Sequence, residues 1–156
     1  MRYLLMYKEG GAYFDLKSAM KYPLNTILSQ KDEYVLTHWR AKCNSRILNN
    51  KMGEYQQWHI ICKPYHPFLK AVINKVMNNI INYNMKIIGV GKMAVLKTTG
   101  PIAYTEAILS IKSQYNHREV KYNDMVGLIY NNLKRSHINL FSSKHYSKIK
   151  EPLILS

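Results

Sequence analysis

Residues 2–17 read RYLLMYKEGGAYFDLK, and this stretch predicts the end of a helix, a sharp turn and a strand. The pair Gly10-Gly11 favours the helix end because glycine turns the backbone without steric cost. The alternation that follows is typical of a short strand. Such a strand would deliver Asp15 to its carboxyl end, where open α/β sheets bind ligands. Taken alone, the stretch is better explained by a solvated aspartate in a helix–turn–strand unit.

Strands and helices alternate along the rest of the chain. The patterns predict a turn or short helix at 23–28, strands at 34–39 and 55–62, and a helix from Pro67 to about 81. They then predict a loop with some strand character at 89–99 and a helix from Gly100-Pro101. The end of the chain is mixed, with an apolar stretch at 125–130 and a strand at 138–141. This alternation favours an α/β or α+β fold. The 156 residues suit a single domain.

The charge balance is strongly basic. The chain has 23 Lys and Arg against 9 Asp and Glu, a formal net charge of +14. Such a surface favours anionic partners, namely nucleic acid, an acidic membrane or phosphorylated small molecules. The basic residues form no long block, and no RNP, helix-turn-helix or zinc-finger pattern accompanies them, so nucleic acid is not favoured.

Two cysteines, Cys43 and Cys62, are too few for a disulfide framework and form no CxxC zinc pattern. They fit a reduced compartment, and a single bridge between them stays open. No apolar run has the length of a membrane span, and the first residues lack a proper signal peptide. A cytoplasmic location is therefore favoured, with the Golgi lumen as the alternative for a chain truncated at its amino terminus.

A second stretch with candidate ligand-binding groups is 56–69, QQWHIICKPYHPFL. His66 stands at the start of the predicted helix, where its ring either caps the helix or faces a ligand cleft. The cap is the favoured interpretation, because the helix dipole disfavours an imidazolium at that end. Trp58 and Tyr65 are able to stack on a sugar ring, although core packing is the commoner use of an aromatic side chain.

The third stretch is 98–108, TTGPIAYTEAI. Gly100 permits a close backbone approach and Pro101 sets the start of a helix. The free N–H groups at such a start suit an anionic group or sugar hydroxyls. Glu106 either complements the helix dipole or faces an acceptor or a metal.

In this order, the three stretches resemble the DXD-containing mannosyltransferase-type enzymes of glycosyltransferase family 32, over residues 2–114. In that family, two acids hold a metal that binds the diphosphate of a sugar nucleotide. Asp15 falls on the first acid, and Lys17 falls on the second, which is a departure. The resemblance implies Mn²⁺ or Mg²⁺ at Asp15, but a protonated lysine cannot ligate a cation. Its ammonium can instead neutralise the departing diphosphate directly.

The resemblance implies part of a GT-A-type fold, with a mixed sheet flanked by helices. It also implies transfer of a hexose, with retention, from a nucleotide sugar to a glycan or other acceptor. Asp15 and Lys17 are the leading candidates for the site. The residues expected to shape the site or to bind donor or acceptor are Gly10, Gly11, Tyr13, Thr99, Gly100 and Pro101, with Glu106 and His66.

Members of the family carry a nucleotide-binding portion before the DXD element, which residues 1–156 lack. We therefore expect the carboxyl-terminal part of a catalytic core, weak binding and slow turnover by this chain alone, and a role for a polypeptide that supplies the earlier portion. Residues 144–148 resemble the basic tail of some members, with His145 as either a late diphosphate ligand or an exposed side chain. An inactive remnant that binds sugar nucleotides and a basic nucleic-acid-binding protein stay open as alternatives.

Overall fold

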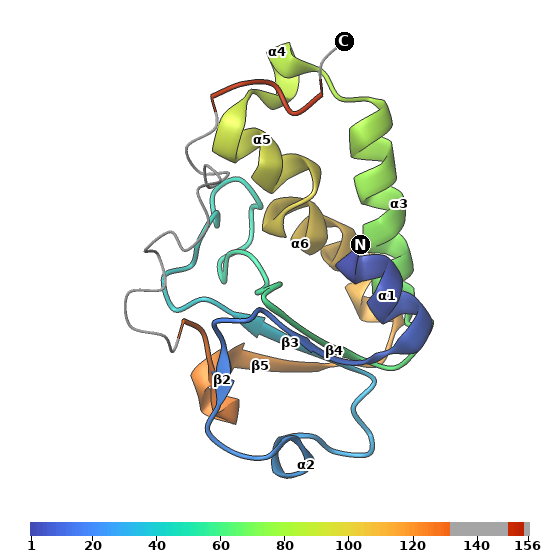
Figure 1. Ribbon diagram of the computed structural model, residues 1–156, viewed down its shortest axis with the longest axis vertical. Coiled ribbons are helices and arrows are strands. Elements are labelled where there is room, and N and C mark those ends of the chain that lie inside the picture. Colours follow the sequence, from blue (N-terminus) through green and yellow to red (C-terminus); the bar gives the residue numbers. More distant parts are fainter. Residues whose placement is uncertain (132–149, 155–156) are drawn as a thin grey trace.

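A four-stranded mixed sheet forms the centre of the molecule, as shown by a computed structural model that describes residues 1–131 and 150–154 (Figure 1). Its strand order is β1 (Gly11–Phe14), β4 (His59–Cys62), β3 (Tyr34–His38) and β5 (Arg118–Tyr122). β4 is antiparallel to both of its neighbours, whereas β3 and β5 are parallel. The predicted α/β class with a mixed sheet flanked by helices is therefore confirmed.

Most of the helices cover one face of this sheet (Figure 1). The longer helices are α1 (Arg2–Glu9), α3 (Pro67–Ile81), α5 (Gly91–Thr98) and α6 (Pro101–Leu109). α3 packs against α1 and α6, and α5 packs against α6. The other face carries the short helix α2 (Leu24–Ile27) and a small antiparallel sheet of β2 (Ala19–Met20) and β6 (Leu128–Ile129). The remaining short elements are α4 (Met85–Ile88), η1 (Lys112–Gln114) and η2 (Asn123–Val126).

The helix, turn and strand predicted from residues 2–17 are confirmed. Gly10 and Gly11 take positive φ angles of 64° and 86°, and the Gly10 N–H closes the helix on the Met6 carbonyl at 3.0 Å. Helix α3 also begins at the predicted Pro67, with His66 as its N-cap. These boundaries depend on glycine, proline and a capping side chain, which act over a few residues.

Two sequence-based expectations were wrong in detail. Residues 89–99 were expected to form a loop, but they contain helix α5. Ala94 and Thr98, one helical turn apart, are buried in the layer where α5 meets α6, so tertiary packing stabilises a helix that local preference did not reveal. The strand expected at 55–62 is shorter, because before β4 only Tyr55 forms a bridge, to His38.

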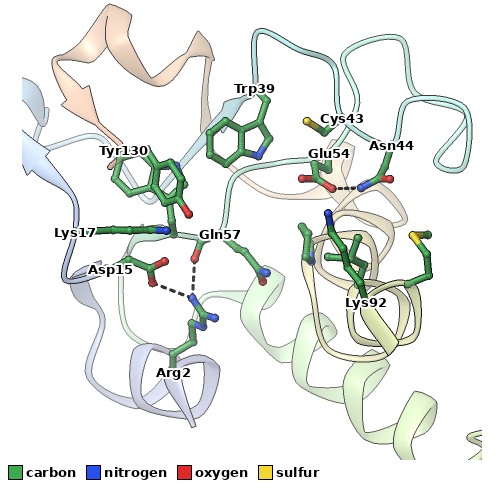
Figure 2. Close-up of a pocket in the computed structure, with 14 residues that line it drawn as sticks. Arg2, Asp15, Lys17, Trp39, Cys43, Asn44, Glu54, Gln57, Lys92 and Tyr130 are labelled. Atoms are coloured by element: carbon green, nitrogen blue, oxygen red, sulfur yellow. Dashed lines mark hydrogen bonds and ion pairs between the residues drawn. The ribbon is translucent and has the colours of Figure 1, made fainter. Parts of the chain in front are cut away.

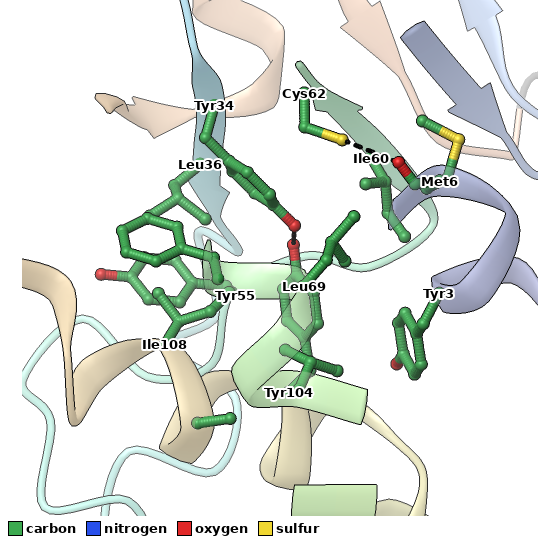
Figure 3. Packing of buried hydrophobic residues seen from close by; sticks show 13 residues of the cluster. Tyr3, Met6, Tyr34, Leu36, Tyr55, Ile60, Cys62, Leu69, Tyr104 and Ile108 are labelled. Atoms are coloured by element: carbon green, nitrogen blue, oxygen red, sulfur yellow. Dashed lines mark hydrogen bonds between the residues drawn. The ribbon is translucent and has the colours of Figure 1, made fainter. Parts of the chain in front are cut away.

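The sheet has a hydrophobic core on each face. Alternate residues of β3 point to opposite sides, so Tyr34 and Leu36 join the core under the helices while Val35 joins the core under α2 and β6. Within the larger core, the hydroxyl groups of Tyr34 and Tyr104 lie 2.7 Å apart (Figure 3). Both side chains are almost fully buried. The pair thereby satisfies two polar atoms that water cannot reach.

We expect Tyr104→Phe to lower the free energy of unfolding by about 1–3 kcal/mol, because the buried Tyr34 hydroxyl loses its partner. The double variant with Tyr34→Phe should recover part of this loss, since removing both hydroxyls leaves no polar atom unpaired. Urea unfolding of the two single variants and the double variant measures the coupling. Additive losses in the double variant would contradict the assigned bond.

Candidate functional site

A cleft with a volume of about 680 Å³ lies at the carboxyl end of β1 (Figure 2). Its walls come from the start of α1, the turn after β1, the connection between β3 and β4, the first turns of α5 and α6, and Tyr130 beyond β6. Its lining includes three cationic side chains, two carboxylates and three large aromatic rings: Arg2, Lys17 and Lys92; Asp15 and Glu54; Trp39, Trp58 and Tyr130.

Asp15 and Lys17 lie where the sequence predicted them. β1 ends at Phe14, and both side chains follow it into the cleft. The backbone of Asp15 is fixed by its N–H bond to the Trp58 carbonyl, at 2.8 Å. The Asp15 carboxylate accepts a bond from the Tyr13 hydroxyl at 2.9 Å. Tyr13, a predicted site residue, thus orients the aspartate.

Arg2 is a cationic side chain of the cleft that sequence analysis missed. Its guanidinium donates to the Asp15 carboxylate at 3.3 Å and to the Gln57 carbonyl at 3.2 Å (Figure 2). It also lies 5.4 Å from the centre of the Tyr13 ring. An arginine one helix before the Gly-Gly turn is a weak sequence signal, because only the folding of α1 against β1 brings the guanidinium to the aspartate.

An aromatic wall formed by Trp39, Trp58 and Tyr130 borders the same end of the cleft. The Tyr130 ring lies 5.1 Å from that of Trp39 and 5.3 Å from that of Trp58. The Lys17 ammonium lies 4.5 Å from the centre of the Tyr130 ring, within the range of a cation–π contact. Trp58 is otherwise buried, so its main role is packing, as expected for a single aromatic.

Glu54 carries the second carboxylate, at the other end of the cleft (Figure 2). Asn44 donates a side-chain hydrogen bond to it, and burial raises the pKa of its carboxyl. The connection between β3 and β4 that supplies these groups contains Lys42, Asn44 and Asn49 at φ angles of 49°, 55° and 46°. Left-handed backbone at residues other than glycine costs free energy and is often found at functional sites.

The start of α6 lines the same cleft as Asp15, as the sequence predicted. Pro101 contributes directly to the lining. Gly100 is needed just before it, because a Cβ atom there would lie 2.7 Å from the Leu96 Cα. The carbonyl of Thr99 is already engaged by the Tyr3 hydroxyl at 3.2 Å. Thr99 and Gly100 therefore shape this wall, whereas Pro101 faces the space.

Several predicted site residues do not line the cleft, among them Gly10 and Gly11 at the turn into β1, Glu106 and His66. The Glu106 carboxylate pairs with the Lys75 ammonium at 2.9 Å, because the second turn of α6 faces α3. The His66 ring accepts a bond from the Phe68 N–H at 3.2 Å, which caps α3. Burial lowers the pKa of His66, so the ring stays neutral at the positive end of the helix. The favoured interpretation of His66 as a cap is confirmed.

Comparison with known proteins brings no further information on this site. No family model, curated protein or solved structure matches the chain. The family resemblance therefore rests on the three stretches of sequence themselves. His145 and the strand expected at 138–141 lie outside the described residues.

The donor set near Asp15 does not fit the divalent cation that the resemblance implies. The side chain in the position of the second acid is Lys17, and the Oδ1 of Asp15 already accepts from Arg2 and Tyr13. Among residues 1–131 and 150–154, no group of three His, Cys, Asp or Glu side chains is placed to hold a metal ion. The charges at this end of the cleft are those of a guanidinium and an ammonium, together with the Asp15 carboxylate to which the guanidinium is bonded.

Two remaining expectations concern the cysteines and the membrane. Cys43 and Cys62 are both free, so the single bridge that the sequence left open is not formed. Burial raises the pKa of the Cys62 thiol to about 12. In the part of the chain that the structure describes, no helix has the length and apolar character required to cross a bilayer.

Proposed function

We propose that the cleft binds a nucleotide sugar and transfers its hexose, with retention, to a hydroxyl group of a glycan or other acceptor. The observation that carries this proposal is that Asp15 and Lys17 share one cleft with Pro101. These residues come from the first and third stretches of the family resemblance, which lie far apart in the sequence. Two motifs of one activity are expected to converge on one site, and unrelated chance matches are not.

The Arg2 and Lys17 end of the cleft suits the diphosphate. Glycosyl transfer leaves negative charge on the departing nucleoside diphosphate, and fixed cations lower the barrier by stabilising that charge. The bond from Arg2 to Asp15 holds the guanidinium in place, and the Tyr130 ring supports the ammonium of Lys17. Both side chains are therefore positioned before the ligand binds, which reduces the entropic cost of binding.

The Glu54 end suits the hydroxyl groups of the hexose. A carboxylate accepts hydrogen bonds from hydroxyls, and Asn44 and Lys92 beside it offer further polar groups. Trp39 lies between this end and Tyr130, and an aromatic face packs well against the apolar face of a sugar ring (Figure 2). Polar groups that bond a substrate hydroxyl also discriminate strongly against ligands without it.

Calorimetry with GDP, GDP-mannose, UDP and UDP-glucose tests the diphosphate end. We expect Lys17→Ala to weaken binding of each nucleotide and its sugar derivative by about tenfold, because both carry the diphosphate. Lys31→Ala is the matched control, since Lys31 is exposed and does not line the cleft. Equal losses in both variants, or equal competition by random-sequence DNA, would instead support a nonspecific basic surface.

The Glu54→Gln variant tests the sugar end in the same assay. We expect it to weaken binding of the nucleotide sugar several-fold more than binding of the free nucleotide, because only the sugar derivative brings hydroxyls to that end. Release of free hexose or its transfer to added oligosaccharide then separates an enzyme from an inactive remnant. Binding without turnover would assign the chain to the remnant class, and absence of binding would contradict the proposed function.

A further inference from the structure

The end of α3 and the start of α4 lie at the end of the molecule farthest from the sheet (Figure 1). Several large apolar side chains of these two helices are exposed. The most exposed of them are Ile81 and Ile87, at 75% and 76%. The α3–α4 surface, as we call it, comprises Met77, Ile80, Ile81, Met85, Ile87 and Val90. Soluble domains seldom expose so many large apolar side chains in one place without a partner for them.

The chain around this surface is basic and carries few acids. Between Glu54 and Glu106 there is no Asp or Glu, while the same segment contains six lysines. Two of them pair with acids elsewhere, Lys63 with Glu33 and Lys75 with Glu106, and Lys92 lines the cleft. Lys86 stands inside α4, between two of the exposed apolar residues. Within the described part of the chain, Lys86 forms no ion pair. The Gly91 N–H donates to the Glu151 carbonyl, so Glu151 lies near this surface. Its single negative charge is smaller than the summed positive charge of the lysines in the segment.

We propose that the α3–α4 surface docks onto an anionic lipid surface. Apolar side chains on a short helical segment enter the boundary between headgroups and acyl chains, and neighbouring lysines remain at the level of the anionic headgroups. A second copy of this chain is a poorer partner, because two chains of charge +14 repel one another. Lysines are also depleted from protein–protein interfaces. This inference does not depend on the proposed function of the cleft.

Co-sedimentation of the full chain with vesicles tests the proposal. One set of vesicles contains phosphatidylcholine alone, and the other also contains about 30% phosphatidylserine, as in an anionic cytoplasmic leaflet. We expect at least tenfold stronger partitioning onto the anionic vesicles, weakening as salt screens the lysines. No sedimentation with either set, or equal sedimentation with both, would overturn the proposal.

Paired variants locate the contact on the α3–α4 surface. We expect the double variant Ile81→Ser, Ile87→Ser to lose about tenfold or more in partitioning, and Lys86→Glu to lose a similar factor. Ile47→Ser and Lys51→Glu are the matched controls, because both residues are exposed in the connection between β3 and β4. Equal losses in the controls would show that the whole basic surface binds lipid, which contradicts a specific docking site.

The Lys86→Glu variant also keeps the test valid if the isoleucine variant misfolds, because Lys86 is exposed and its replacement leaves the apolar side chains unchanged. Light scattering across a concentration range tests the competing explanation, in which the α3–α4 surface forms a dimer contact. A dimer that is lost in Ile81→Ser, Ile87→Ser, without lipid binding by the original chain, would assign the α3–α4 surface to a protein contact and overturn the proposal.

Discussion

Replacing Gly10 with alanine is expected to lower the free energy of unfolding by about 3–5 kcal/mol. Gly10 has a positive φ of 64°, and a Cβ atom there would lie 2.5 Å from the backbone nitrogen of Pro64 and 2.6 Å from its ring Cδ. These atoms cannot move aside easily, because the adjacent Tyr65 N–H is bonded to the Tyr7 carbonyl at 2.6 Å. The methyl group would therefore separate α1 from the loop before α3.

Gly11→Ala is the matched control for this prediction. Gly11 has a similar positive φ of 86°, but no atom lies within 4 Å of the position of its Cβ. It should show the backbone strain alone, about 1 kcal/mol. Urea unfolding of the two variants separates steric overlap from strain. Losses that differ by less than about 1 kcal/mol would show that the contact with Pro64 has no role in stability.

Mild acid is expected to destabilise the protein through His59. This residue lies on β4 with its ring almost fully buried, and its Nε2 is 2.7 Å from the Thr37 hydroxyl. Burial lowers the pKa of the ring from 6.5 to about 3. Below pH 6.5 the unfolded chain therefore binds a proton that the folded protein excludes. Stability should fall by about 1.4 kcal/mol per pH unit, reaching roughly 4–5 kcal/mol near pH 3.

The His59→Gln variant isolates this effect, because glutamine can keep the bond to Thr37 and does not titrate. Between pH 6.5 and pH 4.5, we expect the original protein to lose about 2–3 kcal/mol more than the variant. This window avoids Glu119, whose pKa is lowered to about 2 by its bond to His38, and whose contribution is lost only at more acidic pH. Urea unfolding across the pH range measures both proteins. Parallel pH profiles would contradict a buried, neutral His59.

The contact between Arg2 and Asp15 could not be inferred from the order of helices and strands along the sequence. The distance of Arg2 from Asp15 along the sequence says nothing about contact, and the bond forms only because α1 folds back over the carboxyl end of β1. Glu54 and Tyr130 likewise reach the cleft from connections whose paths are set by distant packing. Glu106 shows the converse, since its place in a motif predicted a site and the packing of α6 on α3 directed it to Lys75.

The sequence by itself determined the local geometry of this protein. The glycine pair at 10–11 ended α1, Pro67 and Pro101 began α3 and α6, and the alternation after the glycine pair indicated β1, because each of these signals acts within a few residues. The sequence patterns did not predict β5, the edge strand of the same sheet. The placement of Asp15 at the end of β1 followed from the same signals. Only the tertiary structure decided that α5 is a helix and which charges share the cleft with Asp15. Those outcomes depend on contacts between residues far apart in the chain, whose free energies have no counterpart in a local pattern.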